Sequence, residues 1–178
     1  ELCRDIAQRF NNDFQVKDFL KVPEPLIQKE FSRIMSLKDG TKKMSKSELS
    51  DLSRINLMDS KDSIINKIKK AKTDPLALPS NLEELNNRPE AKNLLEIYSS
   101  LTDSNLEKSI KDFEGKSFSE FKDKLSQVLV EKIVPISTEI KKLIDDKDFL
   151  DKILTEGYKK ANNIAHKKVK KMHEIIGF

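Results

Sequence analysis

Apolar residues recur at helical spacing through most of the second half of the chain. The longest stripe begins at Phe118 and continues to about Asp145, which predicts an amphipathic helix. Pro135 lies inside the stripe and is expected to kink the helix, because proline removes one backbone hydrogen bond and clashes with the preceding turn. The apolar positions of this stripe are Phe121, Leu125, Val128, Leu129, Ile133, Ile136, Ile140, Leu143 and Ile144.

A second long stripe, from Phe149 to Ile176, predicts a final helical region. Gly157 could interrupt this region, because glycine is a poor helix former. Gly177 is suited to end it, because helices commonly end at a glycine.

Capping signals divide the middle of the chain into shorter helices. Asp59 is expected to cap a helix whose apolar face is formed by Ile64, Ile65, Ile68 and Ala71. Residues 75–88 contain two prolines and several asparagines, and they predict a connecting loop before a helix that starts at Pro89. The capping-box spacing of Ser104 with Glu107, and of Ser117 with Glu120, predicts two further helix starts.

The first 57 residues follow a different pattern. Leu2, Ile6 and Phe10 share one helix face, prolines at positions 23 and 25 favour extended chain, and residues 32–37 predict a short strand. We interpret residues 1–57 as the end of an α/β domain and residues 58–178 as a helical domain. The predicted fold class is therefore mainly α.

The segment Asp39–Ser47 separates these two parts and has the composition of a binding loop. It contains Gly40, the only glycine in the first 114 residues, and Thr41–Ser47 holds three lysines and three hydroxyl side chains. Lysine carries a compact, rotatable charge that suits a phosphate group. The segment lacks the glycine-rich Walker pattern. It predicts a mobile phosphate-binding loop, and the alternative is a solvated lysine-rich turn.

Composition and charge exclude several classes of protein. Lys and Arg number 34 against 30 Asp and Glu, so the net charge is only +4. A single cysteine rules out an intrachain disulfide framework, and two histidines with one cysteine predict no metal-ligand cluster. No apolar run of about 18 residues is present, so no membrane contact is predicted.

The last 20 residues are strongly basic, with Lys167, Lys168, Lys170 and Lys171 close together. Such a cluster can contact the phosphates of RNA, because these contacts need only positive charge. The alternative is a solvated helix face opposite the apolar stripe.

Residues Lys43–Ser47 are, letter for letter, the KMSKS signature of class I aminoacyl-tRNA synthetases. The surrounding sequence resembles the tryptophanyl-tRNA synthetase family along nearly the whole chain. The segments that carry the resemblance are 2–11, 33–37, 53–57, 67–74, 88–89 and 93–98, together with Gly157, Ala161, Ile164 and Ala165. Tyrosyl-tRNA synthetases share the architecture but usually carry a different form of the signature.

The resemblance implies a Rossmann-like nucleotide-binding domain ending at residue 57 and an anticodon-binding type of helical domain after it. The family activates tryptophan with ATP and Mg²⁺, holds no tightly bound cofactor, and transfers tryptophan to tRNA(Trp). It is dimeric and cytoplasmic. By motif position, Lys43 and Lys46 would contact the phosphates as catalytic groups, while Met44, Ser45, Ser47 and the backbone of Ile34 would complete the ATP site.

The chain also departs from the family pattern. It carries no HIGH-like motif and none of the residues that bind tryptophan in the family, so it resembles the C-terminal half of the enzyme and reads as a piece of a longer protein. Tryptophan would be bound by the missing half. We therefore expect the chain alone to be inactive. The alternative function is a non-catalytic helical RNA-binding module.

Overall fold

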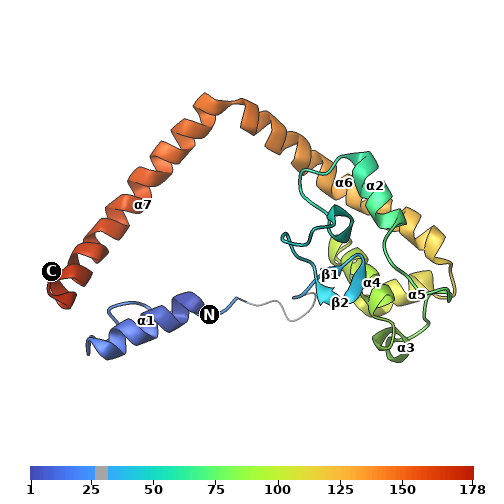
Figure 1. The fold of residues 1–178 in the computed structure, drawn as a ribbon, viewed down its shortest axis with the longest axis horizontal. Helices are drawn as coiled ribbons and strands as arrows, with labels where there is room; N and C mark the ends of the chain where they lie inside the picture. The colour runs from blue at the N-terminus through green and yellow to red at the C-terminus, as the bar shows by residue number, and fades with distance from the viewer. Residues whose placement is uncertain (27–31) are drawn as a thin grey trace. The chain divides into compact units, whose positions relative to one another are not determined.

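The computed structural model describes residues 1–26 and 32–178, and the chain forms two compact units (Figure 1). One unit is Lys29–Lys142, and the other combines Glu1–Gln28 with Leu143–Phe178. The predicted domains, residues 1–57 and 58–178, rest on sequence pattern and resemblance rather than on packing, and they stay a prediction.

A small β-hairpin opens the first of these units. Strand β1 (Met35–Ser36) pairs antiparallel with β2 (Asp39–Lys43), with Met35 opposite Lys43 and Ser36 opposite Asp39. The strand expected within residues 32–37 is present but only two residues long. The prediction of a loop from Asp39 was wrong for its first five residues, which form β2. The turn is fixed because Leu37 is only 2 % exposed and packs into the core.

Helices cover this hairpin and build the core of the unit. The 3-10 helix η1 (Asp51–Ser53) leads into α2 (Lys61–Lys69), α3 (Leu82–Asn86), α4 (Pro89–Leu101), α5 (Leu106–Phe113) and the long α6 (Phe118–Asp145). Strand β2 packs against α4, beside which it lies in Figure 1. Tyr98, Phe113 and Phe121 make edge-to-face contacts at the centre, with ring centroids 4.8–5.9 Å apart. The fold is mainly α, as predicted.

Two of the predicted helix caps were wrong by one residue. Ser60, not Asp59, caps α2 by accepting a hydrogen bond from the backbone N–H of Ser63 (3.2 Å), because Asp59 is turned inward to an ion pair. Asn105, not Ser104, caps α5. The capping box of Ser117 with Glu120 is confirmed by reciprocal bonds of 3.2 Å and 3.3 Å.

Some breaks in the helical pattern were predicted incorrectly. Residues 75–88 are not entirely loop, because α3 forms there with Asn81 as its cap. Helix α6 continues through Pro135, where a kink stays a prediction. Helix α7 (Lys147–Ile176) continues through Gly157 and ends at Gly177, which has a positive φ of 97°.

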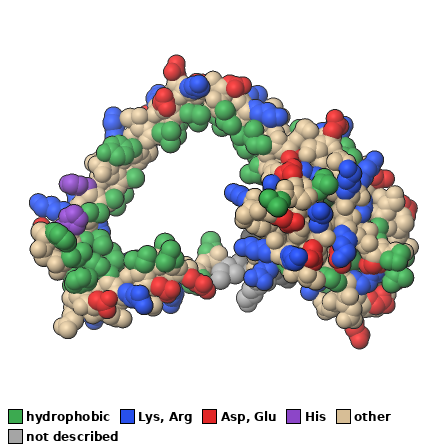
Figure 2. Space-filling model, in the orientation of Figure 1, with side chains coloured by type: hydrophobic (Ala, Val, Ile, Leu, Met, Phe, Trp, Pro, Cys, Tyr) green, Lys and Arg blue, Asp and Glu red, His purple; other side chains and the backbone are tan. Residues whose placement is uncertain are grey.

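The second unit joins α1 (Leu2–Asp13) to α7 through the aromatic segment after α1. Phe10 contacts Phe14 and Phe19, with ring centroids 4.8 Å and 5.7 Å apart. Along α7, which the structure describes in full, no residue is buried. Most of its apolar side chains lie exposed along the helix (Figure 2), and Leu150, Met172 and Ile175 are half-buried. Among the described residues, no helix is long and apolar enough to cross a membrane.

Candidate nucleotide-binding site

The hairpin places the signature segment Lys43–Ser47 beside Ile34. The backbone N–H of Met44 donates to the carbonyl of Ile34 at 3.0 Å, which extends the pairing of Met35 with Lys43 by one residue. Met44 and Ile34 are half-buried and pack against the core, whereas Lys43, Lys46 and Ser47 are exposed. The structure thus brings together the residues predicted to meet adenine and phosphates, on an open surface.

The three lysines within residues 41–47 differ in their surroundings. Lys42 pairs with Asp39 at 3.3 Å. Hydrogen bonds from Thr41 hold the pKa of Asp39 at about 2, so this carboxylate stays ionised and keeps its lysine partner. No carboxylate among the described residues lies within 4.0 Å of Lys43 or Lys46. These two ammonium groups are therefore available for an anionic ligand.

Two serine hydroxyls shape the tip of the segment. The Oγ atoms of Ser45 and Ser47 lie 3.0 Å apart, and the backbone N–H of Ser47 donates to Ser45 Oγ at 3.3 Å. In this local turn the two hydroxyl groups lie close together, and their residues flank Lys46 in the sequence. They add neutral hydrogen-bond donors to the two charged groups.

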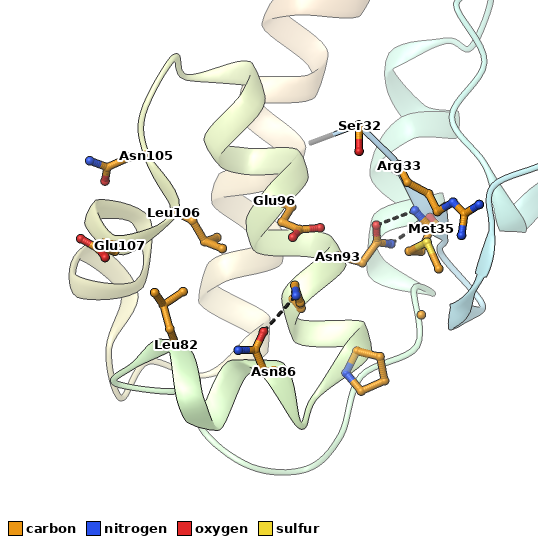
Figure 3. Close-up of a pocket in the computed structure, with 13 residues that line it drawn as sticks. Ser32, Arg33, Met35, Leu82, Asn86, Asn93, Glu96, Asn105, Leu106 and Glu107 are labelled. Carbon is orange, nitrogen blue, oxygen red and sulfur yellow. Dashed lines mark hydrogen bonds between the residues drawn. The ribbon is translucent and has the colours of Figure 1, made fainter. Parts of the chain in front are cut away.

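Asn93 of α4 holds strand β1 in place. Its Oδ1 accepts from the backbone N–H of Met35 and its Nδ2 donates to the carbonyl of Met35, both at 2.9 Å (Figure 3). The side chain is 2 % exposed, so both bonds are protected from water. Asn93 acts as a substitute strand partner and fixes Met35, which follows Ile34 and lies opposite Lys43. The sequence pattern did not predict this role, although an asparagine next to Leu94 and Leu95 in an apolar stripe is a signal of one.

The same helix fixes β2 at its first turn. A Cβ atom added to Gly40 would lie 2.5 Å from the carbonyl carbon of Pro89 and 2.6 Å from the backbone nitrogen of Glu90. Only glycine allows this approach of strand to helix. Lys72 pairs with Glu90 at 2.8 Å, and this contact lowers the pKa of Glu90 and raises the pKa of Lys72. Both strands of the hairpin are therefore held against α4, β1 through Asn93 and β2 through Gly40.

A pocket of about 790 Å³ lies on the other side of Asn93, among α3, α4, α5 and β1 (Figure 3). Lys92 bonds to Asn86 at its wall, and burial raises the pKa of the neighbouring Glu96. None of the described residues predicted to bind ATP lines this pocket. The residues predicted to bind ATP therefore lie outside this pocket, whereas Met35 and Asn93, which hold the strand beside Ile34, line it.

The four lysines predicted to bind tRNA all lie exposed on α7. Lys168 differs from the others, because its Nζ donates to the carbonyl of Phe19 and lies 4.1 Å from the centre of the Phe19 ring. Lys167, Lys170 and Lys171 form no ion pair with another described residue. These three are the better candidates for contact with an external anion.

Comparison with known proteins decides the family. The family model described as tRNA synthetases class I (W and Y) matches residues 1–133. The chain belongs to this family of tRNA synthetases. The resemblance seen in the sequence is thereby confirmed, and the helical fold is that of the synthetase family.

Individual synthetases match the chain along almost its whole length. It is 47 % identical to the tryptophan–tRNA ligase of Agrobacterium fabrum and 48 % identical to that of Rickettsia felis, and it covers 55 % and 53 % of those proteins. The crystal structure of tryptophanyl-tRNA synthetase from Mycoplasma pneumoniae aligns with 98 % of this chain, with a TM-score of 0.81 at 27 % identity, and 51 % of that protein is covered.

A second solved structure, tryptophanyl-tRNA synthetase from Campylobacter jejuni complexed with ADP and tryptophan, aligns with a TM-score of 0.67 at 26 % identity. The alignment covers 98 % of this chain and 52 % of the Campylobacter jejuni protein. The chain thus spans about half the length of the relatives that it matches.

Proposed function

We propose that this chain is the signature-bearing part of a tryptophan–tRNA ligase, which activates tryptophan with ATP and transfers it to tRNA(Trp). The observation that carries the proposal is the placement of two lysines on a synthetase fold: Lys43 ends strand β2 next to the Met44–Ile34 bond, and Lys46 follows three residues later. Neither lysine pairs with a carboxylate among the described residues. The relatives described above are named as tryptophan–tRNA ligases or tryptophanyl-tRNA synthetases, which favours a tryptophan enzyme over a tyrosyl-tRNA synthetase. The family match also disfavours a non-catalytic RNA-binding module.

The proposed chemistry explains why two mobile lysines are needed. The carboxylate of the amino acid attacks the α-phosphorus of ATP, the bond to the pyrophosphate breaks, and negative charge shifts onto the departing oxygens. Lys43 at the end of β2 and Lys46 three residues beyond it are both exposed, and their side chains can follow this charge. They then stabilise the transition state more than the ground state, which is the requirement for a rate effect.

The remaining predicted residues hold the nucleotide. The backbone of Ile34 meets the adenine. Met44 packs against the core of the unit and anchors the segment. The hydroxyl groups of Ser45 and Ser47 donate hydrogen bonds to phosphate. Among the described residues, no group of three or more His, Cys, Asp or Glu side chains could hold a metal ion. The chain therefore suits a Mg²⁺ ion that arrives on the phosphates of ATP, where it would neutralise part of their charge.

Other properties of the proposed enzyme depend on residues outside this chain. Tryptophan would be bound by the part that carries the HIGH-like motif, and that part would supply much of the homodimer contact. We also propose that the enzyme is cytoplasmic, as the family resemblance in the sequence implies.

The proposal is tested by tryptophan-dependent exchange of pyrophosphate into ATP. We expect no exchange above background from this chain alone, because it carries no HIGH-like motif. A chimera in which this chain replaces the matching part of the Agrobacterium fabrum ligase is expected to exchange with tryptophan, whereas the remaining part of that ligase without this chain is not. A folded chimera without exchange would contradict the proposal, and exchange by the chain alone would refute its predicted inactivity.

The basic face of α7 is proposed to contact tRNA. Replacing Lys167, Lys170 and Lys171 together with Gln is expected to weaken binding of tRNA(Trp) to the chain. It should also reduce the slope of log affinity against log salt by roughly one for each phosphate that the variant no longer binds. Fluorescence anisotropy at several salt concentrations measures both quantities. The control replaces Lys141, Lys147 and Lys152, which are also exposed, and an equal weakening in both variants would show a general charge effect only.

A further inference from the structure

A network of charged side chains lies next to the C-terminal end of the signature segment. Lys67 Nζ is 2.6 Å from Asp59 Oδ2 and 2.7 Å from Asp51 Oδ2. The guanidinium of Arg54 contacts the other oxygen of Asp51, with Nη2 to Oδ1 at 3.0 Å. Two cations and two anions therefore form a chain of contacts whose formal charges cancel.

The inner end of this network is fixed. The side chain of Lys67 is 3 % exposed and that of Asp59 is 10 % exposed. Asp59 also accepts from the backbone N–H of Asn56 at 2.9 Å. A lysine buried at this depth is stable as a cation only with such partners, so Lys67 cannot move without a large loss of stability. Asp51 is held by this fixed ammonium group, and the contact with Lys67 lowers the pKa of Asp51.

The outer end of the network reaches the signature segment. Arg54 Nη1 donates to the backbone carbonyl of Glu48 at 2.9 Å, and Glu48 directly follows Ser47. The Glu48 carboxylate in turn accepts from Ser36 Oγ of β1 at 3.4 Å. Glu48, the residue directly after the segment, is therefore bonded both to the charged network and to the hairpin.

The same region is tied to the hairpin turn through the backbone. The N–H of Leu37 donates to the carbonyl of Ser53 at 2.8 Å, and the N–H of Lys72 donates to the carbonyl of Leu37 at 2.7 Å. These bonds join η1, the hairpin turn and the residues after α2, so the region that holds the Glu48 carbonyl is itself bonded to the hairpin.

We propose that Arg54, oriented by Asp51 and Lys67, is a positioning residue for Lys46. It holds the Glu48 carbonyl and so fixes the C-terminal end of the segment from which Lys46 reaches the phosphates. The proposal rests on the nucleotide-binding function proposed above. Lys46 lies two residues before Glu48, a reach of at most about 7 Å of extended chain, so a displaced carbonyl shifts the lysine with it.

Hydrogen exchange on the chain itself tests the anchor without any catalytic assay. Arg54→Ala is expected to speed amide exchange in residues 44–53 about three- to tenfold, as expected from the loss of hydrogen bonds that hold this segment, with helix α4 unchanged. Arg54→Lys, which keeps the charge and one donor, is expected to restore part of the protection. The rates are measured by mass spectrometry of peptic peptides.

Arg88 provides a matched control in the same unit. It also binds a carboxylate twice, at 2.9 Å and 2.6 Å to Asp74, and donates to the backbone carbonyl of Ala77 at 2.7 Å. Arg88→Ala removes equivalent bonds away from the signature segment. If it speeds exchange in residues 44–53 as much as Arg54→Ala does, or if Arg54→Ala has no effect there, the anchor does not exist.

Kinetics of the chimera then test the link to Lys46. Arg54→Ala is expected to lower kcat for pyrophosphate exchange about tenfold with the KM for tryptophan unchanged, because small misplacements of a reacting group slow chemistry steeply. An unchanged kcat, or an equal rise in the KM for tryptophan, would refute the positioning role. An inactive unsubstituted chimera would overturn the proposed function and with it the role of Lys46, whereas hydrogen exchange would still decide whether the anchor exists.

Discussion

Replacing Lys43 or Lys46 with Ala in the chimera is expected to slow tryptophan-dependent pyrophosphate exchange by roughly 10²–10³-fold for each lysine. Both side chains are exposed on the end of the hairpin, and neither has a carboxylate partner among the described residues. Their charge is therefore free to stabilise the pyrophosphate as it leaves. The effect should appear in kcat, because the contact strengthens only in the transition state.

Lys42 is the control for this experiment. It stands next to Lys43 and its side chain is 77 % exposed, but its ammonium pairs with Asp39 at 3.3 Å. Lys42→Ala makes the same change in net charge and is expected to leave the rate within about threefold, since an exposed ion pair contributes little. If Lys42→Ala slowed exchange as much as Lys43→Ala, the segment would act only through its total charge, and the assigned roles would be wrong.

Gly40→Ala is expected to destabilise the unit that contains the hairpin by about 1–3 kcal/mol, the usual cost of forcing atoms into filled space. The added Cβ would meet the backbone of α4, 2.5 Å from the carbonyl carbon and 2.7 Å from the carbonyl oxygen of Pro89. Backbone atoms at a helix start cannot rotate away as a side chain can. Urea unfolding followed by circular dichroism measures the change, and loss of the close approach should also displace Lys43 at the end of the same strand.

Gly157→Ala supplies the opposite case. Nothing lies within 4 Å of a Cβ placed at Gly157, which stands inside α7. Alanine there is expected to stabilise the helix by about 0.5–1 kcal/mol, because glycine loses more backbone entropy on folding. If both substitutions stabilised the protein, Gly40 would not be required for packing, and the hairpin would not depend on its contact with α4.

The sequence predicted the helices of this protein well, because their apolar spacing is a local property. It predicted their ends less well. Asp59 and Ser60 are both good capping residues by type, and only the buried ammonium of Lys67 decides that Asp59 turns inward. Gly157 is a poor helix former, but the favourable residues on both sides carry α7 through it.

For the candidate site, too, the sequence predicted some features and only the structure showed the others. The order of letters in Lys43–Ser47 indicated the family and predicts a phosphate-binding role, since a short signature is a property of the sequence. It did not show that Lys42 pairs with Asp39 while Lys43 has no carboxylate partner among the described residues, because this depends on where β2 places each side chain.

The sequence by itself therefore determined the helical class of the fold, the signature segment and the family to which the chain belongs. Only the tertiary structure decided how that segment is supported. Asn93 bonds to Met35 across 58 positions of sequence, Gly40 meets the start of α4, and Arg54 reaches back to Glu48 from a network centred on Lys67. These contacts leave no periodic pattern in the sequence, because each depends on one polar group or one missing Cβ at the place where two distant segments meet.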